Sequence, residues 1–226
     1  LARDTGRLAA LAQETGCLPH VVDIADRAAL ASRFGGMEID VLVNNAGQNR
    51  RGNLLDNSAE DVDALIDVNL RGVLQLTRLL LPGMAARNLG HVVNVSSVAG
   101  HHAFSSGNTT YHATKAAIHS LSQQLRCDLF GSRVRVTEIS PARVETEIYT
   151  RPLGSSEEAQ KRFFGDYEAL LPQDIADAIE FCLLAPARVD ISLLEIMPTM
   201  QVIGGWRFAR KDGENESDGG LQVGRL

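Results

Sequence analysis

With 226 residues and a hydrophobic fraction of 44%, the chain is long enough for one domain with a substantial core and too short for two large ones. The net charge of -6 and the scattered Lys and Arg residues argue against nucleic-acid or acidic-membrane binding. No apolar stretch reaches the ~18 residues of a membrane span, and no signal-peptide pattern opens the chain. We therefore expect a cytoplasmic protein that acts on small molecules.

The three cysteines predict neither a disulfide framework nor a metal site. Cys17, Cys127 and Cys182 are far apart and odd in number, and none belongs to a Cys-x-x-Cys pair. Buried thiols in a reducing compartment are the simplest interpretation. We accordingly predict no bound metal.

Helical and strand patterns alternate in the first part of the chain. Residues 7–14 have helical spacing, and residues 18–23 form a short apolar run that indicates a strand ending at an acidic residue. Residues 27–34 are again helical. The run IDVLV at residues 39–43 is nearly all apolar, which is typical of a strand covered on both faces.

The alternation continues in the second part. Ser58, followed three residues later by Asp61, is a cap-like signal for a long helical segment that extends to residue 88, with a bend expected near Pro82. The further predicted elements are a strand at 91–97, a helix at 111–130, a strand at 134–139, a helix at 173–184 and a strand at 191–196.

Two segments lack a regular pattern. Residues 141–171 predict a mobile excursion, and residues 211–226 are polar and glycine-rich, which predicts a disordered tail. The ordered part is therefore expected to be a single domain spanning residues 1–210.

Strands alternating with helices indicate an α/β fold with a parallel sheet. Ligands of such sheets bind beyond the carboxyl ends of the strands. The predicted strand ends carry Asp23, Asn44 to Gly47, Ser96, Ser97 and Pro141. We expect these residues to meet in one crevice.

Tyr111 and Lys115 lie four residues apart and project from the same face of a predicted helix. A free tyrosine has a pKa of ~10, too high for efficient proton exchange near neutrality. An ammonium about 4 Å away would stabilise a phenolate by ~4 kcal/mol at an effective dielectric of 20, roughly three pKa units. On its own such a pair is more often a solvated helix face, so the neighbouring motifs decide between the two interpretations.

Those motifs are Asn-Asn-Ala-Gly at 44–47 and the strand-end serines at 96–97. With the Tyr-x-x-x-Lys helix, in this order and at these separations, they resemble the short-chain dehydrogenase/reductase family over nearly all of residues 1–205. The resemblance implies a Rossmann-like, doubly wound parallel sheet and hydride transfer between a nicotinamide cofactor and an alcohol or carbonyl. It also implies a homotetramer built on the helices at 58–88 and 111–130.

The resemblance assigns four residues to the chemistry. It implies that Ser97 binds the substrate oxygen, with Ser96 as the neighbouring alternative, and that Tyr111 exchanges the proton with the substrate. Lys115 would tune Tyr111 and bind the nicotinamide ribose, and Asn69 would anchor a water that links the lysine to solvent. Tyr111 lies fourteen positions after Ser97, where the family usually has a distance of thirteen.

Two further groups are matched to cofactor contacts in the family. Those around the adenosine are Asp23, Ile24, Asn44, Ala46 and Gly47. Those around the nicotinamide are Pro141, Ala142, Val144 and Thr146, besides Tyr111 and Lys115, with Ala142 in place of the usual glycine. Where NAD-preferring members carry an acidic residue the chain has Ala2 followed by Arg3, and an arginine suits a 2′-phosphate. We therefore expect NADP rather than NAD.

The glycine-rich TGxxxGxG fingerprint of the family's pyrophosphate site does not occur in the sequence. The strands around it belong between the strand ending at Asp23 and the one ending at Asn44. We thus expect an interrupted sheet with an unpaired apolar edge at Val41 to Val43, and a natural protein with roughly forty more N-terminal residues.

Three stretches, at 79–97, 133–147 and 193–201, look most like the branch of NADP-dependent 3-hydroxy acid dehydrogenases, which includes serine dehydrogenases. A substrate carboxylate needs a cation, for which Arg50, Arg143 and Arg151 are candidates, although an arginine in such a loop is more often a solvated surface residue. The alternatives are an NADPH-dependent ketone or secondary-metabolite reductase, and a truncated, non-catalytic family member.

Overall fold

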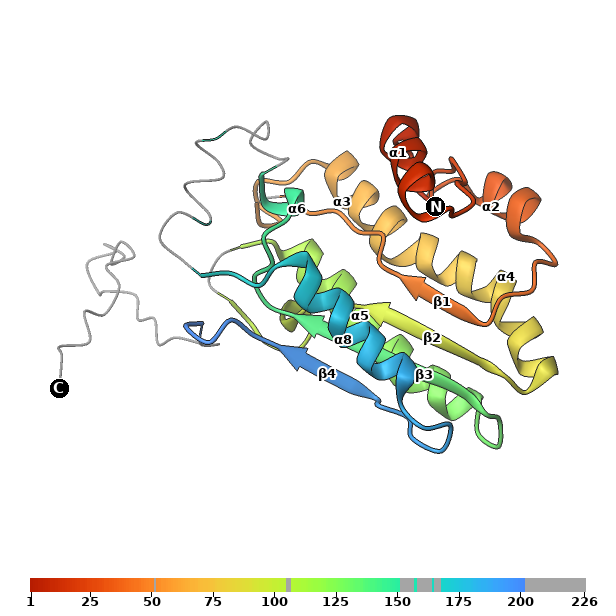
Figure 1. The fold of residues 1–226 in the computed structure, drawn as a ribbon. Helices are drawn as coiled ribbons and strands as arrows, with labels where there is room; N and C mark the ends of the chain where they lie inside the picture. The colour runs from red at the N-terminus through yellow and green to blue at the C-terminus, as the bar shows by residue number, and fades with distance from the viewer. Residues whose placement is uncertain (51, 105–106, 151–156, 158–163, 165–167, 202–226) are drawn as a thin grey trace, which may run out of the picture.

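A computed structural model describes residues 1–50, 52–104, 107–150, 157, 164 and 168–201. They form a parallel sheet flanked by helices, as the alternating pattern predicts (Figure 1). Its strands, in spatial order, are β1 (Val41–Asn44), β2 (Gly90–Val95), β3 (Val134–Pro141) and β4 (Leu193–Ile196). The helices are α1 (Thr5–Thr15), α2 (Arg27–Phe34), α3 (Ala59–Ile66), α4 (Gly72–Arg87), α5 (Thr109–Asp128), α6 (Glu147–Thr150) and α8 (Pro172–Leu184), with a π-helical segment η1 (Asp67–Arg71) and a 3-10 helix η2 (Val98–Gly100).

Successive strand residues pack into opposite layers because side chains alternate along a strand. Val92 and Val136 join a core formed with α2, α4 and α5, whereas Val93 and Ile139 join a second core with α8. In Figure 1, α8 lies in front of the strands and α5 behind them. Both faces of the sheet are therefore covered, which explains why apolar residues of the strands point to both faces.

The helix boundaries follow the local capping signals. The Ser58 hydroxyl accepts a hydrogen bond from the Asp61 amide at 3.1 Å, and Asp26 caps α2 in the same way. Asn88 ends α4 in the left-handed region, with φ of 52°. The long helical segment predicted at 58–88 is present. Its α-helical hydrogen bonding is interrupted at η1 and not at Pro82, through which α4 continues.

The strand predicted at residues 18–23 is wrong. A single parallel bridge joins Ala2 to Val21, outside the four-stranded sheet. A strand needs a continuous neighbour, and α1 begins three residues after Ala2, so the apolar run has nothing further to pair with. Within the described residues β1 pairs only with β2, and Val41 and Val43 at its edge are 42% and 39% exposed. The predicted unpaired edge at Val41 to Val43 is thus confirmed among the described residues, whereas no second part of the sheet is present there.

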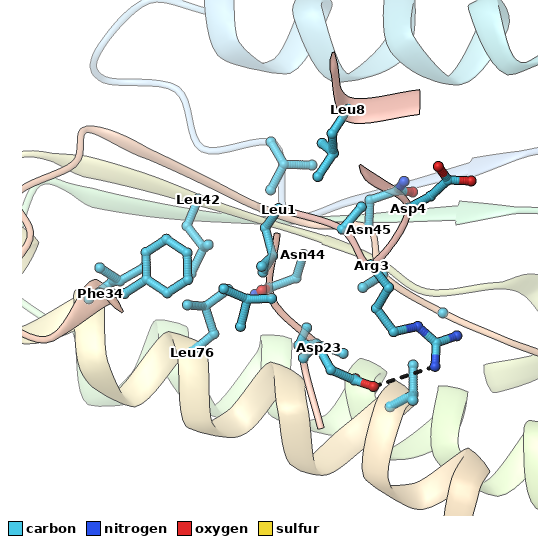
Figure 2. A pocket seen from close by; sticks show the side chains of 18 of the residues that line it. Leu1, Arg3, Asp4, Leu8, Asp23, Phe34, Leu42, Asn44, Asn45 and Leu76 are labelled. Atoms are coloured by element: carbon cyan, nitrogen blue, oxygen red, sulfur yellow. Dashed lines mark hydrogen bonds and ion pairs between the residues drawn. The ribbon is translucent and has the colours of Figure 1, made fainter. Parts of the chain in front are cut away.

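A cavity of about 860 Å³ lies beside this edge of β1. Figure 2 shows Phe34, Leu42 and Leu76 at its apolar end, and Arg3 paired with Asp23 at its polar end. The polar end adjoins the turn that follows β1.

The predicted excursion at 141–171 is described only in part. It contains α6 and a bridge between Val144 and Leu170. The tail predicted at 211–226 lies outside the described residues. None of the helices within the described ranges is long and apolar enough to cross a membrane.

Candidate active site

Lys115 is buried on α5, one turn after Tyr111. Its side chain is 5% exposed, and Nζ donates a hydrogen bond to the Val95 carbonyl at the end of β2, at 2.8 Å. Nζ also lies 5.7 Å from the centre of the Tyr111 ring. Burial lowers the pKa of Lys115 to about 8, against a smaller opposing effect of the Glu138 carboxylate. The side chain is thus a cation at pH 7 that titrates close to neutrality.

The two serines after β2 have different partners. The Ser96 hydroxyl, 2% exposed, donates to the backbone carbonyl of Lys115 at 3.1 Å and so ties β2 to α5. The Ser97 hydroxyl donates to the Pro141 carbonyl at 3.3 Å and accepts from the Ala99 amide at 3.2 Å. Only Ser97 lines the cavities on both sides of Tyr111. This geometry favours Ser97 over Ser96 as the group that meets a ligand.

Asn69 lies in η1 and is 1% exposed. Its Oδ1 accepts from the Gln48 amide at 2.8 Å, while its Nδ2 donates to the Gln48 carbonyl at 2.8 Å and to the Thr114 hydroxyl at 3.3 Å. The π-helical turn therefore clamps the loop after β1 to α5, and such turns are frequent at functional sites. A Cβ on Gly47 would lie 3.7 Å from Asn69 Oδ1 and 3.8 Å from Lys115 Nζ. The bare glycine leaves this space open beside both side chains.

A cavity of about 350 Å³ brings the predicted groups together at the strand ends. Among its lining residues are Asn45, Gly47, Ser96, Ser97, Tyr111, Lys115, Pro141, Ala142, Val144 and Thr146. A smaller cavity of about 120 Å³ adjoins it, lined by Ser97, Tyr111, Phe104, His112, Arg143 and Gln201, among others. Five of the residues expected in one crevice do meet there, namely Asn45, Gly47, Ser96, Ser97 and Pro141, whereas Asp23, Asn44 and Ala46 line the cavity beside β1.

The residues predicted at the adenosine end line the cavity beside β1. Arg3 Nη1 lies 3.4 Å from Asp23 Oδ2, with both side chains well exposed (Figure 2). Ile24 is 8% exposed and packs on α4, where a Cβ on Gly72 would lie 2.7 Å from Ile24 Cγ1. Ala46 and Gly47 both line this cavity, and Gly47 also lies beside the buried Lys115.

The Asn44 side chain points into the protein. Its Nδ2 donates to Asn94 Oδ1 at 2.8 Å and to Thr77 Oγ1 at 3.1 Å, and Asn94 in turn donates to Ser122 Oγ at 2.9 Å. Because a buried amide needs such partners, this network locks β1, β2, α4 and α5 together. Asn44 thus holds the turn in place, and no local sequence pattern indicates this network.

Ala142 replaces the expected glycine without backbone strain. Non-glycine residues with positive φ, among the residues described, are Asn88 and Asn108, so Ala142 adopts an ordinary backbone conformation. Its amide donates to the Ile196 carbonyl at 2.8 Å, which joins the ends of β3 and β4.

His112 faces the smaller cavity, although the sequence analysis did not single it out. Its ring lies edge-on to Phe104 with centroids 5.5 Å apart, and burial lowers its pKa. The lowered pKa favours the neutral form of the imidazole. Phe104 and Gln201, which line the same cavity, lie in loops without a recognisable motif.

These features agree with the sequence comparison. The chain belongs to the short chain dehydrogenase family, whose sequence model matches residues 1–154 and so includes Ser97, Tyr111 and Lys115. A short-chain type dehydrogenase/reductase of Sinorhizobium fredii is 42% identical over 93% of this chain and 84% of its own length. The NADP-dependent 3-hydroxy acid dehydrogenase of Salmonella typhi is 38% identical over 88% of this chain and 84% of its own length.

A solved structure is also similar. The closed form of serine dehydrogenase complexed with NADP⁺ superposes with a TM-score of 0.88 and is 35% identical, covering 93% of this chain and 88% of that one. Family and fold are therefore both established for this chain.

Proposed function

We propose that the protein is an NADP(H)-dependent oxidoreductase that interconverts the hydroxyl group of a small 3-hydroxy acid and the carbonyl group of its semialdehyde. The observation that carries the proposal is that Ser97, Tyr111 and the buried Lys115 line one cavity of about 350 Å³ at the strand ends. NADP supplies or accepts the hydride when it is bound. The protein supplies the proton and positions the substrate.

The residues present fit a dinucleotide. Asn45 and Gly47 line both the cavity beside β1 and the one beside Tyr111, so the two cavities follow one another along the strand ends. Gly47 leaves open the space beside Lys115 that a cofactor ribose requires. Arg3 would hold the 2′-phosphate, and Val144 and Thr146 would hold the nicotinamide end.

In the direction of reduction, the phenol of Tyr111 gives its proton to the substrate oxygen as the carbonyl becomes a hydroxyl. Ser97 donates a hydrogen bond to the same oxygen by turning from the Pro141 carbonyl, where its present bond is long at 3.3 Å. In oxidation, Tyr111 takes the proton back.

Lys115 acts on Tyr111 through its charge. The buried ammonium stabilises the phenolate that remains after the proton is given up, because attraction between charges is stronger away from water. A lysine pKa of about 8 also suits proton resupply near neutrality. Asn69, which holds the Gln48 carbonyl beside this route, would anchor the water that connects Lys115 to solvent.

The smaller cavity suits a small anionic substrate. Arg143 lines it together with Ser97 and Tyr111, whereas Arg50 lines a different cavity, beside Thr146 and Glu147. Arg151 lies outside the described residues. We therefore assign Arg143 to the substrate carboxylate.

An activity panel tests this function. NADP⁺ should be reduced with L-serine or 3-hydroxypropionate, and Arg143→Gln should raise KM for these acids by roughly tenfold or more, while a neutral ketone is turned over as before. Turnover of neutral ketones alone would contradict the 3-hydroxy acid assignment and favour the ketone-reductase alternative. Absence of both turnover and thermal stabilisation by NADPH would contradict the enzymatic proposal as a whole.

The assembly and location are separate proposals. We propose a homotetramer in the cytoplasm, as the family resemblance implies for the helical segments at 58–88 and 111–130. Light scattering coupled to size exclusion tests the assembly, and a monomeric mass would contradict it.

A further inference from the structure

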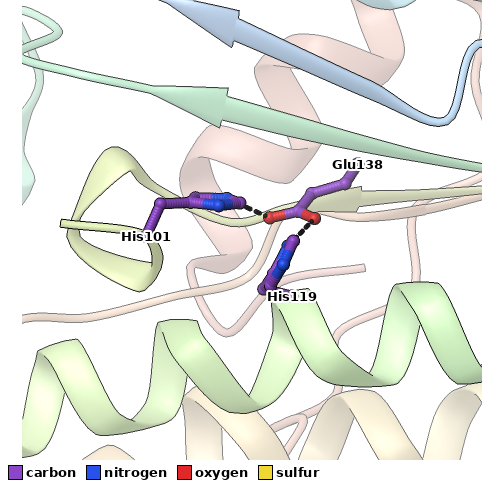
Figure 3. A group of neighbouring side chains, drawn as sticks. All are labelled: His101, His119 and Glu138. Atoms are coloured by element: carbon purple, nitrogen blue, oxygen red, sulfur yellow. Dashed lines mark hydrogen bonds and ion pairs between the residues drawn. The ribbon is translucent and has the colours of Figure 1, made fainter.

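A cluster of two histidines and a glutamate lies where α5, β3 and the end of η2 meet. His101 Nε2 is 2.9 Å from Glu138 Oε1, and His119 Nδ1 is 2.7 Å from Glu138 Oε2 (Figure 3). The two imidazole rings meet edge to face, with centroids 4.1 Å apart. One ligand-type atom of each of the three residues lies within 4.8 Å of the others. We refer to these residues as the His-Glu-His cluster; they do not line the cavities of the proposed active site.

Three elements hold the cluster in place. Glu138, 1% exposed, lies on β3, and His119 lies on α5 one turn beyond Lys115. His101 follows η2, which approaches α5 so closely that a Cβ on Gly100 would lie 2.7 Å from the Lys115 carbonyl oxygen. The glycine permits this approach, which directs the His101 ring toward Glu138. The three side chains are therefore arranged before any ligand arrives.

We propose that the His-Glu-His cluster is a binding site for one zinc-type divalent cation. The ligands are Nε2 of His101, Nδ1 of His119 and the carboxylate of Glu138. Two imidazoles and one carboxylate are a ligand set of zinc sites that keep a fourth position for water. Metal–ligand bonds of about 2.0 to 2.2 Å separate neighbouring ligand atoms by roughly 3.3 Å, so the present nitrogen–oxygen pairs need to widen by only a few tenths of an ångström.

The surrounding groups suit this assignment. A carboxylate as buried as Glu138 needs positive or hydrogen-bonding partners, which the two imidazole N–H groups provide in the metal-free protein. A bound cation takes over that role when the nitrogens bind it in their neutral form.

Gln123 supplies an outer partner for His119. Its Nε2 lies 2.8 Å from His119 Nε2, the nitrogen that faces away from Glu138. When Nδ1 binds a metal, the ring proton moves to Nε2 and is donated to the amide oxygen of Gln123 once that amide turns over. Metal-ligating histidines almost always have such a partner for their second nitrogen.

A nearby pair provides a matched control. His102 Nε2 lies 3.0 Å from Glu195 Oε2, but both side chains are about one-third exposed and the pair is not part of a three-ligand group among the residues described. The His102–Glu195 pair has an imidazole and a carboxylate, as the His-Glu-His cluster does, but lacks the second imidazole. His102→Gln should therefore leave metal binding unchanged.

The test is a titration of metal-free, tag-free protein with Zn²⁺, followed by calorimetry and thermal unfolding, and with Co²⁺ as a visible-absorption probe. One ion per chain should bind and raise the Tm, and Mg²⁺ should not compete because it prefers oxygen ligands. His119→Asn and His101→Gln each keep an N–H donor near the original nitrogen while removing the ligand. Each should weaken Zn²⁺ binding by more than about tenfold.

Two results would overturn the proposal. One is the absence of stoichiometric Zn²⁺ binding to the unaltered protein. The other is unchanged Zn²⁺ affinity in both ligand variants, which would place any bound metal elsewhere. Circular dichroism confirms that the variants fold, and the Co²⁺ spectrum reports directly on nitrogen ligation. Neither readout depends on the proposed enzymatic activity.

Discussion

The centre of the sheet and its β1 edge are built differently. β2 and β3 pair over six residues and are almost entirely buried, and they support the helix that carries Tyr111 and Lys115. At the edge, β1 faces a cavity of about 860 Å³, and a single bridge ties Ala2 to Val21. The groups proposed for proton transfer are thus held by the two central, deeply buried strands. The residues proposed for the adenosine line the cavity at the edge.

Buried polar networks explain the rigidity of the first region. Asn94 is fully buried and uses both ends of its amide, accepting from Asn44 and donating to Ser122. Ser96 joins β2 to the backbone of Lys115. Networks of this kind favour one arrangement, because breaking a bond leaves a further buried group without a partner.

The largest expected loss of turnover tests the groups that β2, β3 and α5 hold in place. Tyr111→Phe removes the exchangeable proton and little else, so turnover should fall by roughly a thousandfold. Thermal stabilisation by NADPH should persist, since the ring and Lys115 remain. Near-normal turnover in steady-state assays would refute the proposed role of the tyrosine.

Substitutions of the two serines test which of them contacts the substrate. Ser97→Ala should lower kcat/KM by roughly a hundredfold because a hydrogen bond to the developing substrate charge is lost. Ser96→Ala loses only a bond to the Lys115 backbone, of about 1 kcal/mol, and should stay within a few-fold of the unaltered enzyme. A larger loss for Ser96→Ala would reverse the assignment.

A pair of core substitutions compares the packing around β3 with the packing beside the β1 edge. Ile139→Ala empties a fully buried site and should lower the free energy of unfolding by about 3 kcal/mol. Leu8→Ala, at the wall of the large cavity, should lower the free energy of unfolding by only about 1 kcal/mol, because the side of Leu8 that faces the cavity makes few van der Waals contacts. Urea unfolding measures the free energy of unfolding of both variants. Equal losses would show that the two regions are equally well packed.

A change in stability of opposite sign, smaller than that of Ile139→Ala, is expected when the buried charge is removed. The pKa of Lys115 falls from 10.5 to about 8 on folding, so between these values the unfolded chain holds more protons and the stability of the protein rises with pH. The shift corresponds to roughly 3 kcal/mol at pH 7, of which the bond to Val95 offsets about 1 kcal/mol. Lys115→Met should therefore be inactive yet about 2 kcal/mol more stable at pH 7. Its unfolding should also lack the rise between pH 8 and 10.5, and an equally steep rise in the variant would contradict this account.

Local sequence determined much of this protein. The helix at 27–34 has the predicted bounds, and Ser58 caps its helix as its spacing from Asp61 indicates. Helices form hydrogen bonds within one segment, so their signals are local. The Tyr-x-x-x-Lys spacing likewise placed both groups on one face, because that face is set by the helical period.

Tertiary structure decided the rest. The apolar run at 18–23 was not a strand because a strand requires a neighbour, and Asn44 turned inward because β2 and α4 offer it partners. His101, His119 and Glu138 lie 18 and 19 positions apart, with no motif connecting them. Only the packing of η2, α5 and β3 brings the three side chains within hydrogen-bonding distance, since contacts between distant segments are fixed by the fold and leave no period in the sequence.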